Sequence, residues 1–498
     1  MEFSHPLFIG RPLIGRRSAA ALTIALLLTA SESPIFVGEA RAQPNDQRRI
    51  ERQLRIADSA LLRYAPDPNL SLEERSLLEF GGNLSFTALF LRDATENSRR
   101  LLQPEAVVYA RGSIDGAHNA FGRVRLTYRD YSEGDSFDGR PDRIDEPVLD
   151  RYWYEFDARR ALQAGGSAGA QGANFNIRAG RQFVDWGAGL ALSSTLYAVR
   201  PTIDFSRSVR IEGLAGITPD HTIDFDASRV DYDEKTRRTY FGARLVVSDQ
   251  SNNEYYAYYL YSGDNYNRTV SRAPIIFTDV IFDSPSHFVG LGTTLSLSDN
   301  LSLLGEVVGQ FGTTFSDPIR GPQVRDEVVA AAMRVQASYI FRDNIKSRLE
   351  FEFLAGTGDG DRLSPTDTVG GNAPGTTDRA FNSLGFANTG LAFGAPLNNL
   401  TATRIGYNCE PFGDIGQTSN LQVGIDGFLF GKFRTQAPID EPTNLRTFLG
   451  AEIDLFVNYR ITSDLAISAR YGIFLPGEAV AGSEAARDFA LFSVVLSF

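Results

Sequence analysis

The chain has 498 residues, a formal net charge of −12 and a slightly negative mean hydropathy. The negative charge argues against binding to nucleic acid, which needs a basic surface. A single cysteine, Cys409, excludes a disulfide framework and any cysteine-held metal cluster, and we expect no cofactor or metal. The composition fits either several soluble domains or one large membrane β-barrel, whose alternating strands give a weak hydropathy signal.

Residues 1–42 are predicted to be a secretory signal peptide. Three arginines precede the short apolar run 19–28, and a small-x-small cleavage site ends at Ala42. An apolar run of this length is too short to cross a membrane as a helix. Residues 43–79 are predicted to form a periplasmic extension that is partly helical over 49–62. Binding of this extension to a periplasmic secretion partner is the alternative to a purely structural role.

Residues 80–498 are predicted to form one all-β domain, a closed antiparallel transmembrane β-barrel. In 121–131, Val124, Leu126 and Tyr128 alternate with polar residues, and 345–355 alternates in the same way. Such segments run to about ten residues or more, as tilted membrane-spanning strands require, whereas soluble strands are usually shorter. The clearest strands lie at 83–92, 105–114, 121–131, 149–161, 174–184, 207–217, 238–248, 254–262, 287–298, 301–312, 327–341, 345–355, 420–431, 446–460, 464–474 and 487–498.

The connections between these strands are of two kinds. Short polar turns occur at 298–300, 342–344 and 462–464. Long stretches rich in Gly, Asp and Pro lie at 132–147, 185–206, 263–286, 313–325 and 356–396. Short periplasmic turns that alternate with long extracellular loops are typical of outer-membrane barrels.

This alternation also predicts the number of strands. The sixteen clearest strands would place two of the short polar turns outside the cell. One further strand in 218–237, where His221–Val230 alternates, and another at 397–407 bring the short turns to the periplasm. We therefore predict about eighteen strands, with sixteen as the fallback.

The last predicted strand, 487–498, ends on an aromatic residue. Phe492 and Phe498 share one face of its alternating pattern. Soluble chains seldom end this way, because their termini are usually frayed and polar. An aromatic strand end of this kind is typical of bacterial outer-membrane barrels. We therefore expect the protein to lie in the outer membrane of a Gram-negative bacterium, in contact with its lipid.

If the apolar face of the barrel meets lipid, the opposite face lines the lumen. Fixed arginine and lysine charges select anions, and guanidinium groups suit carboxylates. Three arginines on the strand 121–131 are the most suggestive group, because like charges on one face repel unless they are compensated. In the alternative, lumen charges pair across strands and only stiffen the wall. The predicted pore-lining residues are Arg123, Arg125, Arg129, Arg151, Arg178, Arg210, Arg244, Arg334, Lys346, Arg348 and Arg460.

Two segments resemble a known family. The segment 175–182, Phe-Asn-Ile-Arg-Ala-Gly-Arg-Gln, followed by Trp-Gly, resembles the strand-end G-R-Q motif of the alginate-export family of outer-membrane porins, and 207–213 is similar to that family's next strand. The predicted count of eighteen strands matches the barrel of that family. The resemblance implies passive passage of an anionic polysaccharide or another small anion. It places Arg178, Arg181 and Arg210 near the constriction, and so adds Arg181 to the predicted pore lining.

Two other functions remain open. A general or substrate-specific uptake porin is the nearest alternative, and the loop 356–396 could plug or gate such a pore. An outer-membrane hydrolase is a weaker alternative, because the mature chain offers only His118, His221 and His287 as catalytic bases. Its one G-x-S-x-G match, 165–169, lies in a Gly/Ala-rich connection rather than at a strand-to-helix turn. We therefore expect no enzyme activity.

Overall fold

The structure of the chain is a computed structural model. It describes residues 71, 75–92, 98–132, 142–165, 172–220, 222, 237–251, 253–265, 269–271, 279–281, 283–316, 322–362, 372–413, 420–439, 443–481 and 484–498. The predicted signal peptide and the helix predicted over 49–62 lie outside these residues, as does most of the predicted strand 218–237. Within the described part of the chain, no helix is long and apolar enough to cross a membrane.

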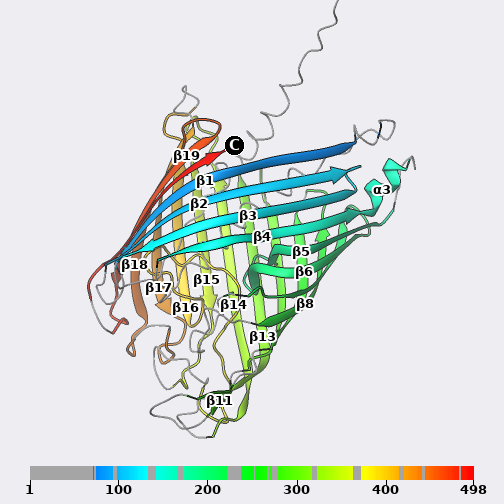
Figure 1. The fold of residues 1–498 in the computed structure, drawn as a ribbon. Coiled ribbons are helices and arrows are strands. Elements are labelled where there is room, and N and C mark those ends of the chain that lie inside the picture. The colour runs from blue at the N-terminus through cyan, green and yellow to red at the C-terminus, as the bar shows by residue number, and fades with distance from the viewer. Residues whose placement is uncertain are drawn as a thin grey trace, which may run out of the picture.

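Eighteen strands form one closed antiparallel sheet, which confirms the predicted β-barrel and its strand count (Figure 1). Each strand pairs with its neighbours along the chain, apart from a separate hairpin of β10 (Thr269–Ser271) and β11 (Asp279–Ile281). The barrel strands are β1 (Ser76–Arg92), β2 (Ser98–Ile114), β3 (His118–Tyr131), β4 (Arg143–Asp157), β5 (Asn174–Trp186), β6 (Leu192–Asp204), β7 (Val209–Ile217), β8 (Arg238–Ser248), β9 (Glu254–Asp264), β12 (Ser286–Ser296), β13 (Leu301–Phe315), β14 (Arg325–Ile340), β15 (Arg348–Gly356), β16 (Leu400–Cys409), β17 (Leu421–Lys432), β18 (Phe448–Arg460), β19 (Leu465–Pro476) and β20 (Arg487–Ser497).

The first and last strands close the cylinder. β20 pairs with β1 from Asn83↔Ser497 to Leu91↔Phe489. Beyond the last ladder pair, the backbone N–H of Phe498 donates to the carbonyl of Gly82 at 2.9 Å, and Gly82 donates back at 2.9 Å. Closure matters because an unpaired strand edge exposes backbone polar groups, which lipid cannot satisfy.

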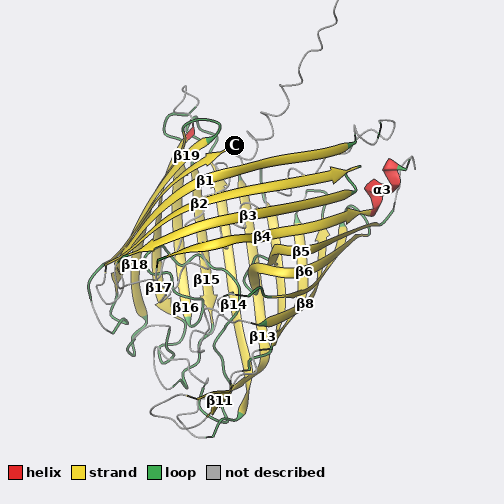
Figure 2. Cartoon of the chain, in the orientation of Figure 1, coloured by secondary structure: helices red, strands yellow, loops and turns green. Residues whose placement is uncertain are grey.

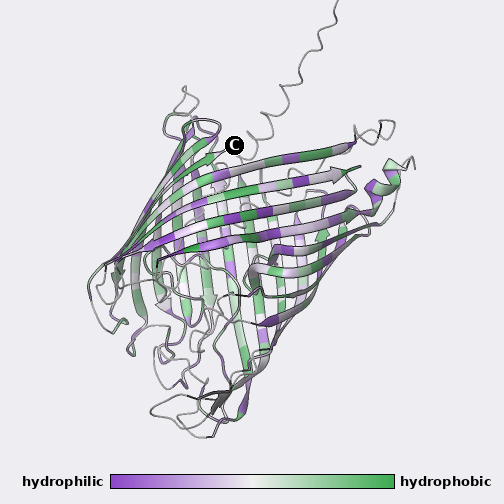
Figure 3. Ribbon diagram, viewed as in Figure 1, coloured by the Kyte–Doolittle hydropathy of each residue, from purple (hydrophilic) through white to green (hydrophobic). Residues whose placement is uncertain are grey.

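The two faces of the wall differ in polarity. On β18, Ile453, Leu455 and Val457 are 40–48% exposed on the outside, whereas Glu452 and Asp454 are buried on the inside. Bands of hydrophobic and hydrophilic residues alternate along the strands in Figure 3. An apolar outer face over a charged inner face is the arrangement of a barrel surrounded by lipid.

Aromatic and histidine side chains mark both ends of the outer face. At one end, His118 Nδ1 lies 2.6 Å from the hydroxyl of Tyr154. At the other end, His287 Nδ1 lies 2.7 Å from the hydroxyl of Tyr259. Rings with a polar tip suit the boundary between hydrocarbon and headgroups, so these pairs fit the aromatic girdles of a membrane barrel.

The strands are joined mostly by short turns at one end of the barrel, which we call the turn end, and mostly by longer connections at the other, which we call the loop end. The turn end also carries two longer connections, 158–173 and 410–420. Outer-membrane barrels turn these ends to the periplasm and the cell exterior, respectively. The turn between β14 and β15 shows how the short turns are fixed. Asp343 accepts a hydrogen bond from the backbone N–H of Ser347 at 2.9 Å, and this bonding lowers the pKa of Asp343 below its usual value.

One strand lies elsewhere than predicted. The sequence predicts a loop over 185–206, but most of this stretch belongs to β5 and β6. β7 pairs directly with β8 up to Ile217↔Thr239, so no barrel strand lies between them, and the strand predicted in 218–237 is wrong. The sequence signal for β6 is weak because the strand begins with small polar residues and contains Pro201, which cannot donate to the ladder.

β4 also begins and ends earlier than predicted, over Arg143–Asp157 instead of 149–161. The sequence predicts a strand to residue 161, but β4 ends at Asp157, whose side chain accepts a hydrogen bond from the backbone N–H of Arg160 at 3.0 Å. An aspartate in this position caps a helix N-terminus, and α3 (Ala158–Ala164) begins directly after it. Figure 2 shows this short helix at the end of the long strands, outside the wall.

Candidate functional site: the barrel lumen

A hairpin folds from the wall into the lumen. β4 and β5 pair only as far as Tyr152↔Arg181. Beyond this point, residues 182–196, which form the ends of β5 and β6 and the turn between them, no longer pair with β4 or β7. Nearly all of them are buried. We call this segment the inner hairpin.

The long connection between β15 and β16 supplies a second segment inside the barrel. Its residues 372–399 are described, and we call them the inner loop. Leu384 forms a parallel β-bridge with Leu192 of the inner hairpin. The N–H of Phe386 also donates to the carbonyl of Gly189 at 2.9 Å. These contacts confirm that part of the loop predicted at 356–396 occupies the lumen.

Asp378 fastens the inner loop to the wall near the loop end. Its carbonyl accepts from the N–H of Val329 at 2.8 Å, and its own N–H donates to the carbonyl of Glu327 at 2.8 Å. Its carboxylate pairs with Arg362 at 2.8 Å. Burial raises the pKa of Asp378, and the nearby Arg362 opposes this effect only in part.

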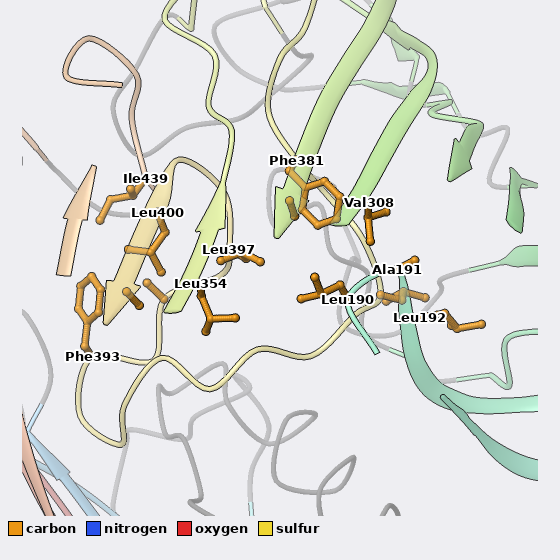
Figure 4. Close-up of a cluster of buried hydrophobic side chains, with 14 of the residues drawn as sticks. Leu190, Ala191, Leu192, Val308, Leu354, Phe381, Phe393, Leu397, Leu400 and Ile439 are labelled. Carbon is orange, nitrogen blue, oxygen red and sulfur yellow. The ribbon is translucent and has the colours of Figure 1, made fainter. Parts of the chain in front are cut away.

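The two inner segments and the wall together form an apolar layer in the lumen (Figure 4). Phe393 of the inner loop stacks on Phe474 of β19, with ring centroids 4.5 Å apart. The inward face is therefore apolar near the loop end, because inward side chains there pack against these segments. Members of the layer include Leu190, Ala191, Leu192, Val308, Leu354, Phe381, Phe393, Leu397, Leu400 and Ile439.

Towards the turn end from this layer, the charges on β14 to β17 form a compact buried network. Arg404 contacts three carboxylates, Glu350 at 2.7 Å, Glu352 at 3.2 Å and Asp426 at 2.9 Å. Arg334 pairs with Glu352 at 2.7 Å. These side chains are at most 10% exposed. This part of the wall fits the alternative in which paired charges stiffen the barrel.

The inward charges on β2 to β8 are more accessible. Arg178, Arg200 and Arg244 are 16–18% exposed, although acids lie beside them. Arg244 pairs with Glu212 at 2.6 Å, and Arg178 pairs with Glu155. We call this side of the lumen the open sector. Its charged residues are Glu105, Arg125, Arg129, Arg143, Asp145, Glu155, Arg178, Arg200, Asp204, Arg210, Glu212 and Arg244.

The three arginines on β3 are compensated by acids on neighbouring strands. Asp150 contacts Arg123 at 2.9 Å and Arg125 at 2.8 Å, and Asp145 contacts Arg129 at 2.9 Å. Asp150 falls at a register shift between β3 and β4. Sequence analysis missed Asp150 because such a shift breaks the period-two pattern that assigns residues to a face. It missed Asp145 because this residue lies in the stretch 132–147, which is predicted to be a loop, whereas β4 begins at Arg143.

The structure places two predicted pore-lining residues away from the lumen. Arg181 pairs across the sheet with Tyr152 and Tyr197 on the outer face, and its guanidinium lies 5.7 Å from the ring centre of Tyr197. Lys346 lies in a turn and pairs with Glu410 at 2.6 Å. The other predicted residues occupy inward positions of the wall, namely Arg123, Arg125, Arg129, Arg151, Arg178, Arg210, Arg244, Arg334, Arg348 and Arg460.

The resemblance places Arg178 and Arg210 near the constriction, and the two differ in position. Arg178 lies four residues before the inner hairpin begins, with its guanidinium 4.2 Å from the ring centre of Trp153. Arg210 lies near the turn end, is 48% exposed and pairs with Asp204 at 2.7 Å. Only Arg178 is therefore close to the narrowed part of the lumen.

The chemistry required by the hydrolase alternative finds no support among the described residues. His118 and His287 contact tyrosines on the outer face, and His221 lies outside the described residues. The described part of the chain also contains no group of three or more His, Cys, Asp or Glu side chains arranged to hold a metal ion.

Comparisons with known proteins give a family and a fold. A family model described as "Alginate export" matches residues 222–490, more than half of the chain. OccK5 (OpdH) of Pseudomonas aeruginosa has a similar structure, with a TM-score of 0.50 and 11% identity over 86% of this chain and 100% of that one. OccAB4 of Acinetobacter baumannii has a TM-score of 0.52 and 10% identity over 84% of this chain and 98% of that one. At such identities the similarity shows the fold alone. No curated protein matches the sequence.

Proposed function

Because this chain belongs to the alginate-export family and is an outer-membrane channel, we propose that anionic solutes cross it passively, anionic polysaccharides among them. The open sector is the observation that carries this proposal, because its arginines stay partly exposed beside their acid partners. In a passive pore the direction of net transport follows the gradient of the solute.

The geometry of the open sector suits a carboxylate-bearing solute. A solute that loses water at a narrow point needs fixed charge of the opposite sign, and guanidinium groups offer paired donors to a carboxylate. Arg178 and Arg244 each lie over an indole ring, Trp153 at 4.2 Å and Trp186 at 5.3 Å. Stacking of this kind holds a guanidinium plane in place, which favours paired contacts with a carboxylate.

Ion selectivity in planar bilayers tests the proposal. We expect the wild-type channel to prefer chloride over potassium, and R178Q/R200Q/R244Q to shift the reversal potential towards cation preference. The matched control is R92Q/R325Q/R342Q, which removes as many positive charges from exposed sites outside the lumen. Cation preference in the wild-type channel, or equal reversal potentials for the two triple variants, would contradict the proposal.

Uptake of small solutes by a porin is the second candidate function. The inner hairpin and the inner loop narrow the lumen, which suits a small anion better than a polymer. Uronate oligomers of increasing length distinguish the two candidates when they are added to a single-channel recording. Current block that strengthens with oligomer length supports passage of a polysaccharide, whereas block by the monomer alone supports uptake of a small acid.

A further inference from the structure

We propose that Glu306 and Glu452 are positioning residues that set the bore of the channel, each by holding the tip of one inner segment through its backbone N–H groups. The inference rests on the proposed channel function. It assigns to these two wall carboxylates a role distinct from the anion contacts of the open sector.

Glu306 of β13 holds the inner hairpin. Its carboxylate accepts a hydrogen bond from the backbone N–H of Ala188 at the hairpin tip. It also accepts from the hydroxyls of Tyr256 and Tyr258 of β9, both at 2.8 Å. From β14, the guanidinium of Arg334 donates to the carbonyl of Ala188 at 3.3 Å. The Ala188 residue is therefore held through both its N–H and its carbonyl, by side chains of two neighbouring strands.

Glu452 of β18 holds the inner loop in the same manner. Its carboxylate accepts from three consecutive backbone N–H groups, those of Leu391, Ala392 at 2.7 Å and Phe393 at 2.9 Å. Glu452 is 1% exposed. A buried carboxylate is costly unless hydrogen bonds satisfy it, so the loop backbone and Glu452 stabilise each other.

Both contacts depend on a glycine in a left-handed conformation. Gly187 has φ +65° and Gly390 has φ +89°. A Cβ at Gly187 would lie 2.6 Å from an oxygen of Glu306, and one at Gly390 would lie 2.5 Å from an oxygen of Glu452. The same combination, a wall carboxylate under the glycine tip of an inner segment, therefore occurs twice in the lumen.

The two anchored segments are also joined to each other. Leu192 and Leu384 form the parallel β-bridge, and the hydroxyl of Ser383 donates to the carbonyl of Leu190 at 2.7 Å. The constriction is thus one body that Glu306 holds from β13 and Glu452 holds from β18, while the Asp378 contacts attach its base to β14. Loss of one carboxylate loosens the tip of one inner segment, and loss of both loosens the two tips together.

Cysteine labelling and conductance test this assignment in a C409S background. Leu391 is 1% exposed, so L391C reports release of the inner loop when a water-soluble maleimide is added. We expect E452Q to raise the labelling rate about tenfold, because losing hydrogen bonds to a charged group shifts a local opening equilibrium by that order. Glutamine keeps the volume of Glu452, and heat-modifiable migration on gels shows that the barrel has folded. We also expect single-channel conductance to rise in E306Q and E452Q.

A matched control and a rescue complete the experiment. Glu79 is also an inward wall carboxylate, but it contacts Tyr109 and Arg111 of the neighbouring strand, so E79Q is expected to leave labelling and conductance unchanged. A disulfide between L192C and L384C joins the inner segments. It should restore the low conductance of E306Q, in which the inner loop is still held, and fail to restore it in E306Q/E452Q.

The outcomes separate this inference from the proposed function. Conductance and labelling of folded E306Q and E452Q that match those of E79Q would overturn the role of the two glutamates. Reversal potentials report anion preference independently. A channel without anion preference would contradict the proposed function but would leave the role of Glu306 and Glu452 standing. Labelling does not require current at all, and it tests the inner loop even in a protein that does not conduct.

Discussion

At the residue scale, Arg404 shows how the lumen tolerates buried charge. Its guanidinium contacts Glu350, Glu352 and Asp426, and none of these side chains is more than 6% exposed. Taking a carboxylate out of water is unfavourable, and the guanidinium of Arg404 contacts three of them here, with Arg334 at Glu352 and Arg348 at Glu350 as further partners. The sequence analysis does not single out Arg404, because its strand, 397–407, is predicted only from the alternation of the turns. Only the register of β15, β16 and β17 brings its partners together.

Replacing Arg404 is therefore expected to destabilise the barrel strongly. R404Q removes the guanidinium that three buried carboxylates share, although Glu352 keeps Arg334 and Glu350 keeps Arg348. Breaking a buried ion pair in this way costs about 3–5 kcal/mol. Urea-induced unfolding in lipid vesicles, followed by tryptophan fluorescence, measures the change in the free energy of unfolding. The control is R325A, which breaks the exposed pair with Asp283 and should cost about 0–1 kcal/mol. Equal effects of the two variants would show that the Arg404 network is not structural.

At the element scale, the inner hairpin depends on how β5 leaves the wall. Gly180 precedes the last residue that pairs with β4, and it has φ +140°. A Cβ there would lie 2.3 Å from the carbonyl oxygen of Tyr152. At this position β5 lies very close to β4 and then turns away from the wall into the lumen. Only a glycine allows this backbone conformation without a clash. The sequence contains this glycine within the G-R-Q motif, but the motif alone does not show that the strand ends turn inward.

G180A is expected to lower the free energy of unfolding by about 1–3 kcal/mol, which is the usual cost of a strained backbone conformation. The clash with Tyr152 adds to this cost. The matched control is G122A in β3, where a Cβ meets no atom within 4 Å. This variant should change the free energy of unfolding only slightly. Unfolding midpoints in urea compare the two variants. An equally small shift for G180A would mean that β5 can rearrange at this point without strain.

At the scale of the whole molecule, the apolar outer face predicts how the barrel sits in a bilayer. Ile453 lies near the middle of β18 and is 48% exposed, and Leu297 lies directly after β12 at the turn end and is 59% exposed. The cost of an arginine on the lipid face depends on depth, being largest at the midplane and small at the interface. The two positions therefore measure whether lipid surrounds this wall.

We expect I453R to lower the free energy of unfolding by about 2–4 kcal/mol in lipid vesicles, and L297R by about 0–1 kcal/mol. Both variants keep the inward face unchanged, so a difference reports membrane depth alone. Reversible urea titrations at fixed lipid composition measure the free energy of unfolding of each variant. Should the two arginines cost the same, the outer face would not lie across the bilayer as its hydropathy indicates.

The sequence by itself determined the class of the fold. Long segments with a period of two predicted a membrane barrel, and the succession of short and long connections predicted eighteen strands. The structure confirms the barrel and its strand count. These features are local, since the face of each residue along a strand follows from the alternation alone. The same reasoning assigned most of the arginines to the inward face.

Only the tertiary structure decided what fills the barrel. The inner hairpin and the carboxylates that hold its tip depend on contacts between residues over a hundred positions apart, such as Ala188 and Glu306. Asp150 reaches the β3 arginines only because of a register shift. No pattern within one strand encodes which distant backbone N–H a carboxylate will meet. The bore of the channel is therefore a property of the closed barrel rather than of any single segment.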